Sequence, residues 1–159
     1  MFGFLTHKKT EHPRLAQLRK LGLFSTLRPR ELRVVDGLLH EREYLAGEVV
    51  FDEGEEGQAL YVVLKGRVLI CRQGEPVTGK ITEIESGVVF GELALLDDAP
   101  RAAQARAAED CVLASLARGD FESLLDTHAV VASKIALQLA RQLGRQLRDR
   151  SASGERKPL

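Results

Sequence analysis

Glycine residues at short, regular intervals constrain the fold of this 159-residue chain more than any other feature. Between residues 41 and 116, short runs rich in valine, isoleucine and leucine alternate with these glycines. The runs are Glu48–Phe51, Ala59–Leu64, Arg67–Arg72, Lys80–Ile84, Ala103–Ala108 and Cys111–Leu116. The interrupting glycines are Gly47, Gly54, Gly57, Gly66, Gly74, Gly79 and Gly87. Interruptions this frequent are incompatible with helices and favour an antiparallel sandwich or barrel of short strands.

Helical patterns flank this strand-rich region on both sides. From about Pro13 to His40, leucine and valine recur at steps of three and four residues, with an interruption at Ser25–Arg30. A longer helix is predicted from about Ala129 to Arg150. Its apolar stripe consists of Ala129, Ala132, Ala136, Leu139, Leu143 and Leu147. A heptad-like stripe suits both packing against the chain's own sandwich and pairing with a second copy.

Composition excludes several classes of protein. Lys+Arg and Asp+Glu both number 23, and this balance argues against a general nucleic-acid binder. Cys71 and Cys111 lie in apolar runs and are predicted to be buried thiols, while the four histidines have no metal-ligand spacing. We therefore expect no metal and no cofactor. Because no signal peptide or membrane span is apparent, we also expect a cytoplasmic location and no membrane partner.

One non-strand interval, Glu92–Pro100, lies inside the strand-rich region and precedes an arginine between a proline and two alanines. A guanidinium can grip two oxygens of a phosphate through paired N–H donors, so Arg101 suits a small anion. The backbone amides of Ala102 and Ala103 can add donors. A short helical turn at Leu93–Leu96 would direct its unpaired N–H groups toward the same anion.

Glu92 suits a second task at the same place. In a 3′,5′-cyclic nucleotide the 2′-hydroxyl is the one free hydroxyl of the ribose, and a carboxylate accepts its proton. Gly91 lets the backbone approach the sugar closely. The carboxylate also repels ligands with extra phosphate charge near the ribose. These residues together predict a pocket for a cyclic nucleotide.

The segment closely resembles the phosphate-binding cassette of cyclic nucleotide-binding domains. The matching residues are Gly91, Glu92, Leu93, Ala94, Leu95 and Leu96, followed by Pro100, Arg101, Ala102 and Ala103 without insertion or deletion. Residues 23–32 and 49–68 also resemble this family, and the likeness covers roughly residues 14–150. It implies an eight-stranded antiparallel jelly roll with N-terminal helices and a long C-terminal helix. It also implies that Glu92 binds the ribose hydroxyl and Arg101 the cyclic phosphate.

The resemblance supplies further expectations. The ligand-binding residues expected from it are Gly91, Glu92, Leu93, Ala94, Pro100, Arg101, Ala102 and Ala103. Family members selective for cGMP often have threonine directly after the arginine, so Ala102 favours cAMP, with cGMP as the alternative. By alignment with the bacterial regulators of the family, Gln146 on the long helix is placed to face the base, and a glutamine amide can pair with adenine.

The predicted domain organisation has one folded unit. Residues 1–13 are expected to be a flexible tail and residues 151–159 a disordered one. The domain itself is expected to span 14–150, with the sandwich at 41–118 and the C-terminal helices at 119–150.

The predicted function is that of a stand-alone cAMP sensor. Ligand binding would reposition the C-terminal helices and thereby regulate an unknown effector protein or a second copy joined through the long helix. One alternative is a ligand-free structural or interaction module of the same fold. Another is a relative of the transcription regulators without its own DNA-binding domain, since no helix-turn-helix follows the long helix and direct DNA binding is not expected. No Ser/His/Asp or Cys/His arrangement predicts an enzyme, so no catalytic residue is assigned.

Overall fold

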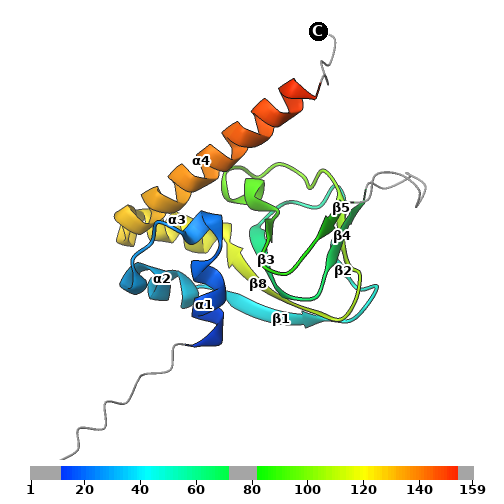
Figure 1. The fold of residues 1–159 in the computed structure, drawn as a ribbon, viewed down its shortest axis with the longest axis horizontal. Coiled ribbons are helices and arrows are strands. Elements are labelled where there is room, and N and C mark those ends of the chain that lie inside the picture. The colour runs from blue at the N-terminus through cyan, green and yellow to red at the C-terminus, as the bar shows by residue number, and fades with distance from the viewer. Residues whose placement is uncertain (1–11, 72–81, 154–159) are drawn as a thin grey trace, which may run out of the picture.

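Short strands separated by glycine turns form two facing sheets in the computed structural model, which describes residues 12–71 and 82–153 (Figure 1). The described strands are ordered β1-β8-β3-β6 in one sheet and β2-β7-β4-β5 in the other. All neighbouring pairs are antiparallel. The bounds in the first sheet are His40–Tyr44 (β1), Cys111–Ala117 (β8), Ala59–Lys65 (β3) and Val89–Phe90 (β6). Those in the second are Val49–Phe51 (β2), Gln104–Ala107 (β7), Val68–Cys71 (β4) and Thr82–Ile84 (β5).

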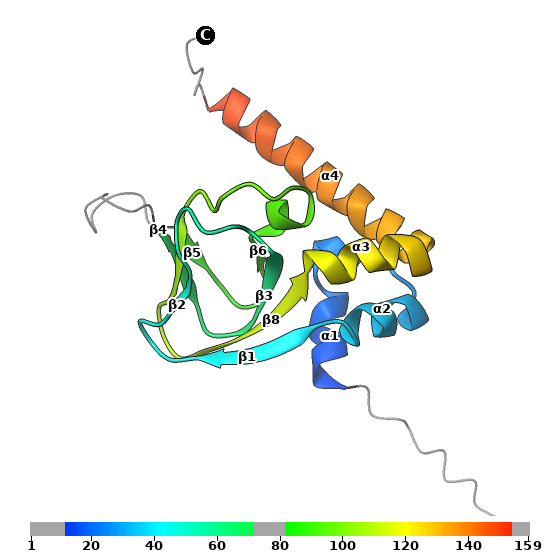
Figure 2. The ribbon, with the colours of Figure 1, turned by 180° about the vertical axis from the view of Figure 1, so that it is seen from behind.

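Helices from both ends of the chain pack together beside the first sheet, as the two opposite views show (Figures 1 and 2). Those before the sandwich are α1 (Pro13–Arg19), the 3-10 turn η1 (Gly22–Phe24) and α2 (Pro29–Asp36). Those after it are α3 (Arg118–Thr127) and α4 (Ala129–Ala152), and a further 3-10 turn, η2 (Glu92–Leu95), follows β6. The predicted mainly-β fold, eight antiparallel strands with flanking helices, is confirmed.

Strand β3 separates two hydrophobic cores because its side chains alternate between the faces of the sheet. Leu60, Val62 and Leu64 belong to the core shared with the helices. Val63 belongs to the core inside the sandwich, and Tyr61 packs against that core. Burying a leucine or valine side chain contributes roughly 1.5–3 kcal/mol, so β3 holds both layers to one frame.

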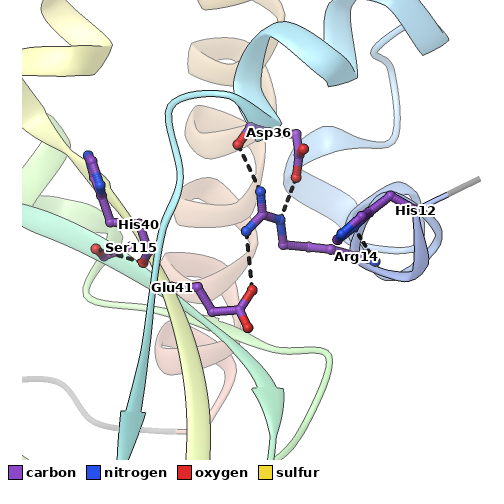
Figure 3. Close-up of polar contacts among 6 residues, drawn as sticks. All are labelled: His12, Arg14, Asp36, His40, Glu41 and Ser115. Atoms are coloured by element: carbon purple, nitrogen blue, oxygen red, sulfur yellow. Dashed lines mark hydrogen bonds and ion pairs between the residues drawn. The ribbon is translucent and has the colours of Figure 1, made fainter.

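An ion-pair network around Arg14 ties α1 to the rest of the N-terminal region (Figure 3). Its Nε lies 2.5 Å from Asp36 Oδ1 at the end of α2, and its Nη1 lies 3.1 Å from Glu41 Oε2 on β1. A third N–H donates to the Asp36 carbonyl at 3.2 Å. The hydrogen bond to Asp36 is the main reason that the pKa of Arg14 is raised. The network fixes the N-terminal helices on the sandwich.

The fully buried residues of α4 all lie in its first half. Val131, Ala132, Ile135 and Leu139 are buried, whereas Leu147 is 66% exposed. Of the predicted stripe, Ala132 and Leu139 are buried and Ala136 and Leu143 are partly buried, but Ala129 and Leu147 are exposed. Both views show the second half of the helix running past η2 and beyond the sandwich (Figures 1 and 2).

Several predicted boundaries shift by one or two residues. Strand β1 begins at His40, and β8 gives way to α3 at Arg118 rather than at 119. Helix α1 begins at Pro13 and α4 continues to Ala152, so both reach into the segments expected to be tails. The rest of those segments, residues 1–11 and 154–159, lies outside the described residues.

Two other expectations concern the cysteines and membrane-spanning helices. The predicted burial of both thiols is confirmed for Cys111 in β8 but is wrong for Cys71, which is half-buried at the end of β4; both are free thiols. Within residues 12–71 and 82–153, no helix has both the length and the apolar character that a membrane crossing requires.

Candidate functional site: a cavity beneath the long helix

A cavity of about 460 Å³ lies between the sandwich, the η2 segment and α4. Its volume falls in the range of small-molecule sites. The structure places all nine predicted ligand-binding residues around this cavity: Gly91, Glu92, Leu93, Ala94, Pro100, Arg101, Ala102, Ala103 and Gln146. Its other lining residues are Phe51, Gly57, Ile70, Phe90, Asp97, Ala99 and Arg150. Their role in binding a ligand stays a prediction.

The backbone at Gly91 is shaped so that Arg101 can lie against it. Gly91 has φ 70° and ψ 21° and directly precedes η2, which starts one residue before the predicted turn. A Cβ atom at position 91 would lie 2.7 Å from the Arg101 Nη1 atom. The left-handed conformation therefore favours glycine, and a Cβ at this position would displace the end of the Arg101 side chain.

Arg101 is held in place from several sides. Its Nη1 donates to the Gly91 carbonyl at 3.2 Å and its Nη2 to the Ala59 carbonyl at 2.6 Å. Its guanidinium carbon lies 4.0 Å from the centroid of the Phe51 ring. Burial lowers the pKa of Arg101, although nearby Tyr61 and Glu55 oppose this effect. An arginine remains charged under these conditions, so the cavity contains a partly desolvated cation that an anion can neutralise.

Further donors lie beside this cation. Across the described part of the chain, the backbone N–H groups of Ala102 and Ala103 have no hydrogen-bond partner. The Arg101 N–H, by contrast, donates to the Glu55 carbonyl at 2.7 Å, which fixes the loop. Two free amides next to a guanidinium make a strong site for a phosphate.

Glu92 faces the long helix across the cavity wall. Gln142 Nε2 on α4 donates to Glu92 Oε1 at 3.4 Å. Gln146 and Arg150, one and two turns further along α4, also line the cavity. A carboxylate that accepts from an amide can also accept from a sugar hydroxyl. The second half of α4 therefore covers the part of the cavity that contains Glu92.

Arg118 joins the cavity to α3. Its Nη1 donates to the Asp97 carbonyl at 2.6 Å and to the Gly57 carbonyl at 3.0 Å. Its backbone N–H donates to the Gln58 carbonyl at 2.7 Å. Asp97 and Gly57 both line the cavity, so the first residue of α3 holds two of the segments that form its wall.

Sequence reasoning missed several of these residues. Phe51, Ile70 and Phe90 form an apolar wall, but in the sequence they are ordinary strand residues with no ligand signal. Gln142 and Arg150 carry a detectable signal, since each stands four residues from Gln146 on one helix face. Among the described residues, no group of His, Cys, Asp or Glu is arranged to hold a metal ion.

Comparison with known proteins decides which family has this arrangement. The family model for the cyclic nucleotide-binding domain matches residues 41–128, which is more than half of the chain. The chain belongs to this family. The matched residues include the segment at residues 91–103.

Curated relatives and solved structures agree with this assignment. The chain is 37% identical over 124 residues to the cyclic AMP receptor protein of Thermus thermophilus, covering 76% of this chain and 56% of that protein. It is 38% identical over 110 residues to the cAMP-dependent protein kinase regulatory subunit of Aspergillus niger, covering 69% of this chain and 26% of that protein. The chain thus spans about half or less of these relatives.

A similar solved structure is the N-terminal domain of a transcriptional regulator from Streptomyces coelicolor. It has a TM-score of 0.73 and 29% sequence identity, and the match covers 84% of this chain and 93% of that structure. The cyclic nucleotide-binding domain described above therefore has the fold of a domain that occurs in a larger regulator.

Proposed function

We propose that this cyclic nucleotide-binding domain is a sensor of cAMP, with Arg101 binding the cyclic phosphate and Glu92 the ribose 2′-hydroxyl. The single observation that carries the proposal is that Arg101, Glu92 and the free amides of Ala102 and Ala103 surround one cavity. A cation with neighbouring N–H donors suits the phosphodiester, and a carboxylate suits a hydroxyl. The proposed role is binding, and no catalytic residue is assigned.

Three observations support cAMP over cGMP. Position 102 is alanine, which has no hydroxyl for a guanine amino group. Gln146 lines the cavity from α4, and a glutamine amide can pair with N6 and N7 of adenine. The two relatives described above are also named for cyclic AMP. cGMP remains the alternative ligand to be measured.

We propose that α4 transmits the bound state to a partner. Gln142 contacts Glu92, and Gln146 and Arg150 line the cavity, from a segment of α4 that is mostly exposed. A ligand that contacts this segment would shift its position, because it binds better to one placement of the helix than to another. An effector protein or a second copy of the chain would read the change, and Val130, Leu137 and Leu147 leave exposed apolar surface on α4 for either.

Isothermal titration calorimetry with cAMP, cGMP and AMP tests the proposal. We expect Arg101→Ala to weaken cAMP binding by about 2–5 kcal/mol, as for loss of one side of a buried charge pair. Glu92→Ala should weaken it by roughly 1.5–3 kcal/mol, since a hydrogen bond to a charged group is lost.

Matched controls are Arg106→Ala and Glu43→Ala, which remove exposed charges from β7 and β1, away from the cavity lining. They should bind like the wild type. Absence of binding of any cyclic nucleotide at high micromolar concentration would reject the sensor and favour the ligand-free interaction module.

A further inference from the structure

Three aromatic rings from three different strands contact one another, and two of them, Phe51 and Phe90, line the cavity. Phe51 on β2 lies 5.7 Å from Tyr61 on β3 and 6.1 Å from Phe90 on β6, measured between ring centroids. Tyr61 and Phe90 are stacked at 5.3 Å with an interplanar angle of 17°. Because these strands belong to both sheets, the rings are fixed by the sandwich itself.

One member of this cluster, Phe51, lies against the Arg101 guanidinium. The guanidinium carbon is 4.0 Å from the Phe51 centroid and 5.8 Å from that of Tyr61. Phe51 itself is 8% exposed, and it lines the cavity together with Arg101. A cation over an aromatic face is attracted by the ring quadrupole, most strongly where water is excluded.

The ring and the two carbonyl acceptors together determine the orientation of the guanidinium. The bonds to the Gly91 and Ala59 carbonyls fix two of its N–H groups, and the Phe51 ring covers one side of the group. A guanidinium has five N–H donors. Within the described residues two of them are engaged in this way, so the others remain for a ligand beside the Ala102 and Ala103 amides.

We infer that Phe51 is a positioning residue for ligand binding, because its ring holds the Arg101 guanidinium in the orientation that binds the phosphate. The inference rests on the proposed function. Phe51 acts through Arg101 and is not assigned a hydrogen bond to the ligand. Leucine at this position would leave that side of the guanidinium open to water and less fixed in orientation, so an anion would have to displace that water and order the side chain.

Calorimetry and NMR titration with cAMP test this inference on the wild type and on Phe51→Leu. We expect Phe51→Leu to bind cAMP about 5- to 30-fold more weakly, the range that a desolvated cation–π contact allows. In an Arg101→Ala background, the same substitution should change the affinity less than about twofold, because the group that Phe51 positions is absent. Phe121→Leu, which alters a buried phenylalanine in α3, is the matched control for a general loss of core packing.

A second readout needs no ligand. The Phe51 ring current should shift the Nε–H signal of Arg101 in the NMR spectrum of the free protein, and Phe51→Leu should abolish that shift. If the leucine variant does not fold, Phe51→Met replaces it with a side chain of similar length and no ring.

Wild-type affinity in the variant, or an equal loss in the Arg101→Ala background, would overturn the inference. Failure of the wild type to bind any cyclic nucleotide would instead reject the proposed function, while the ring-current shift would still report the stacking.

Discussion

The Arg101 side chain fills the space that any side chain at position 91 would need, so the two residues depend on each other. A Cβ at Gly91 would lie 2.7 Å from Arg101 Nη1, and the backbone there has φ 70°. We expect Gly91→Ala to lower the free energy of unfolding by about 1–2 kcal/mol through backbone strain. It should also weaken cAMP binding about tenfold or more by displacing the guanidinium, an effect of about 1.4 kcal/mol.

Gly87→Ala separates these two effects. Gly87 has φ 85°, but nothing lies within 4 Å of a Cβ built there. The control should therefore lose a similar amount of stability in urea unfolding while binding cAMP like the wild type in calorimetry. Equal affinities of the two variants would contradict the dependence of Arg101 on Gly91.

The sequence predicts those residues of the candidate site that lie close together in the chain. Glu92 and Arg101 stand nine positions apart, and their side-chain chemistry alone indicates a hydroxyl and a phosphate as binding partners. Phe51 could not be found in the same way, because it reaches Arg101 through the pairing of β2 with β7. A contact made by sheet topology leaves no local pattern in the sequence.

Between elements, an ion pair joins α4 to α2 and gives the fold a dependence on pH. Lys134 Nζ lies 2.6 Å from Glu31 Oε1, and the Arg28 N–H donates to the same carboxylate oxygen at 2.8 Å. The hydrogen bond from Lys134 is the main reason that the pKa of Glu31 is lowered. A carboxylate with a lowered pKa in the folded state stabilises the fold above its unfolded pKa, and this stabilisation is lost as the pH falls through the folded pKa.

The free energy of unfolding should therefore fall by about 1 kcal/mol through this pair as the pH drops below roughly 4.5. Urea unfolding at pH 6 and pH 3.5 measures the effect in the wild type and in Glu31→Gln. The difference between the two proteins should be present at pH 6 and shrink at pH 3.5. Lys20→Met, a change at an exposed lysine that follows α1, is the control. A difference that does not change with pH would contradict the role of the Glu31 charge.

Helix periodicity predicted α4 well but not which of its residues are buried. The predicted apolar stripe includes Ala132 and Leu139, which are buried, but omits Val131 and Ile135, which are buried as well. These two residues lie on the same side because the packed face of the helix is wider than a heptad seam. The predicted stripe also includes Leu147. This side chain is exposed because it lies in the part of α4 that extends beyond the domain.

Across the whole molecule, α4 consists of a packed part and a largely exposed part that borders the cavity. Ile135 and Leu139 have no exposed surface, whereas every residue from Arg145 to Ser153 is exposed. Gln142 touches Glu92, and Gln146 and Arg150 line the cavity. A ligand in the cavity would thus add contacts to the second half of α4, and local opening of that half should become less frequent.

Hydrogen exchange followed by mass spectrometry measures this directly. We expect saturating cAMP to slow amide exchange in residues 144–152 by about tenfold, which corresponds to about 1.4 kcal/mol, while residues 131–139 should change little because they are already packed. At a cAMP concentration that saturates the wild type but not Arg101→Ala, that variant should show little slowing because it binds cAMP more weakly, and Gln146→Ala should show a smaller slowing than the wild type. Calorimetry could instead show bound cAMP while residues 144–152 exchange at the ligand-free rate, and the ligand would then not act on α4. The signal would have to leave the cavity by another route. The nearest such route is the set of contacts from Arg118 to Asp97 and Gly57.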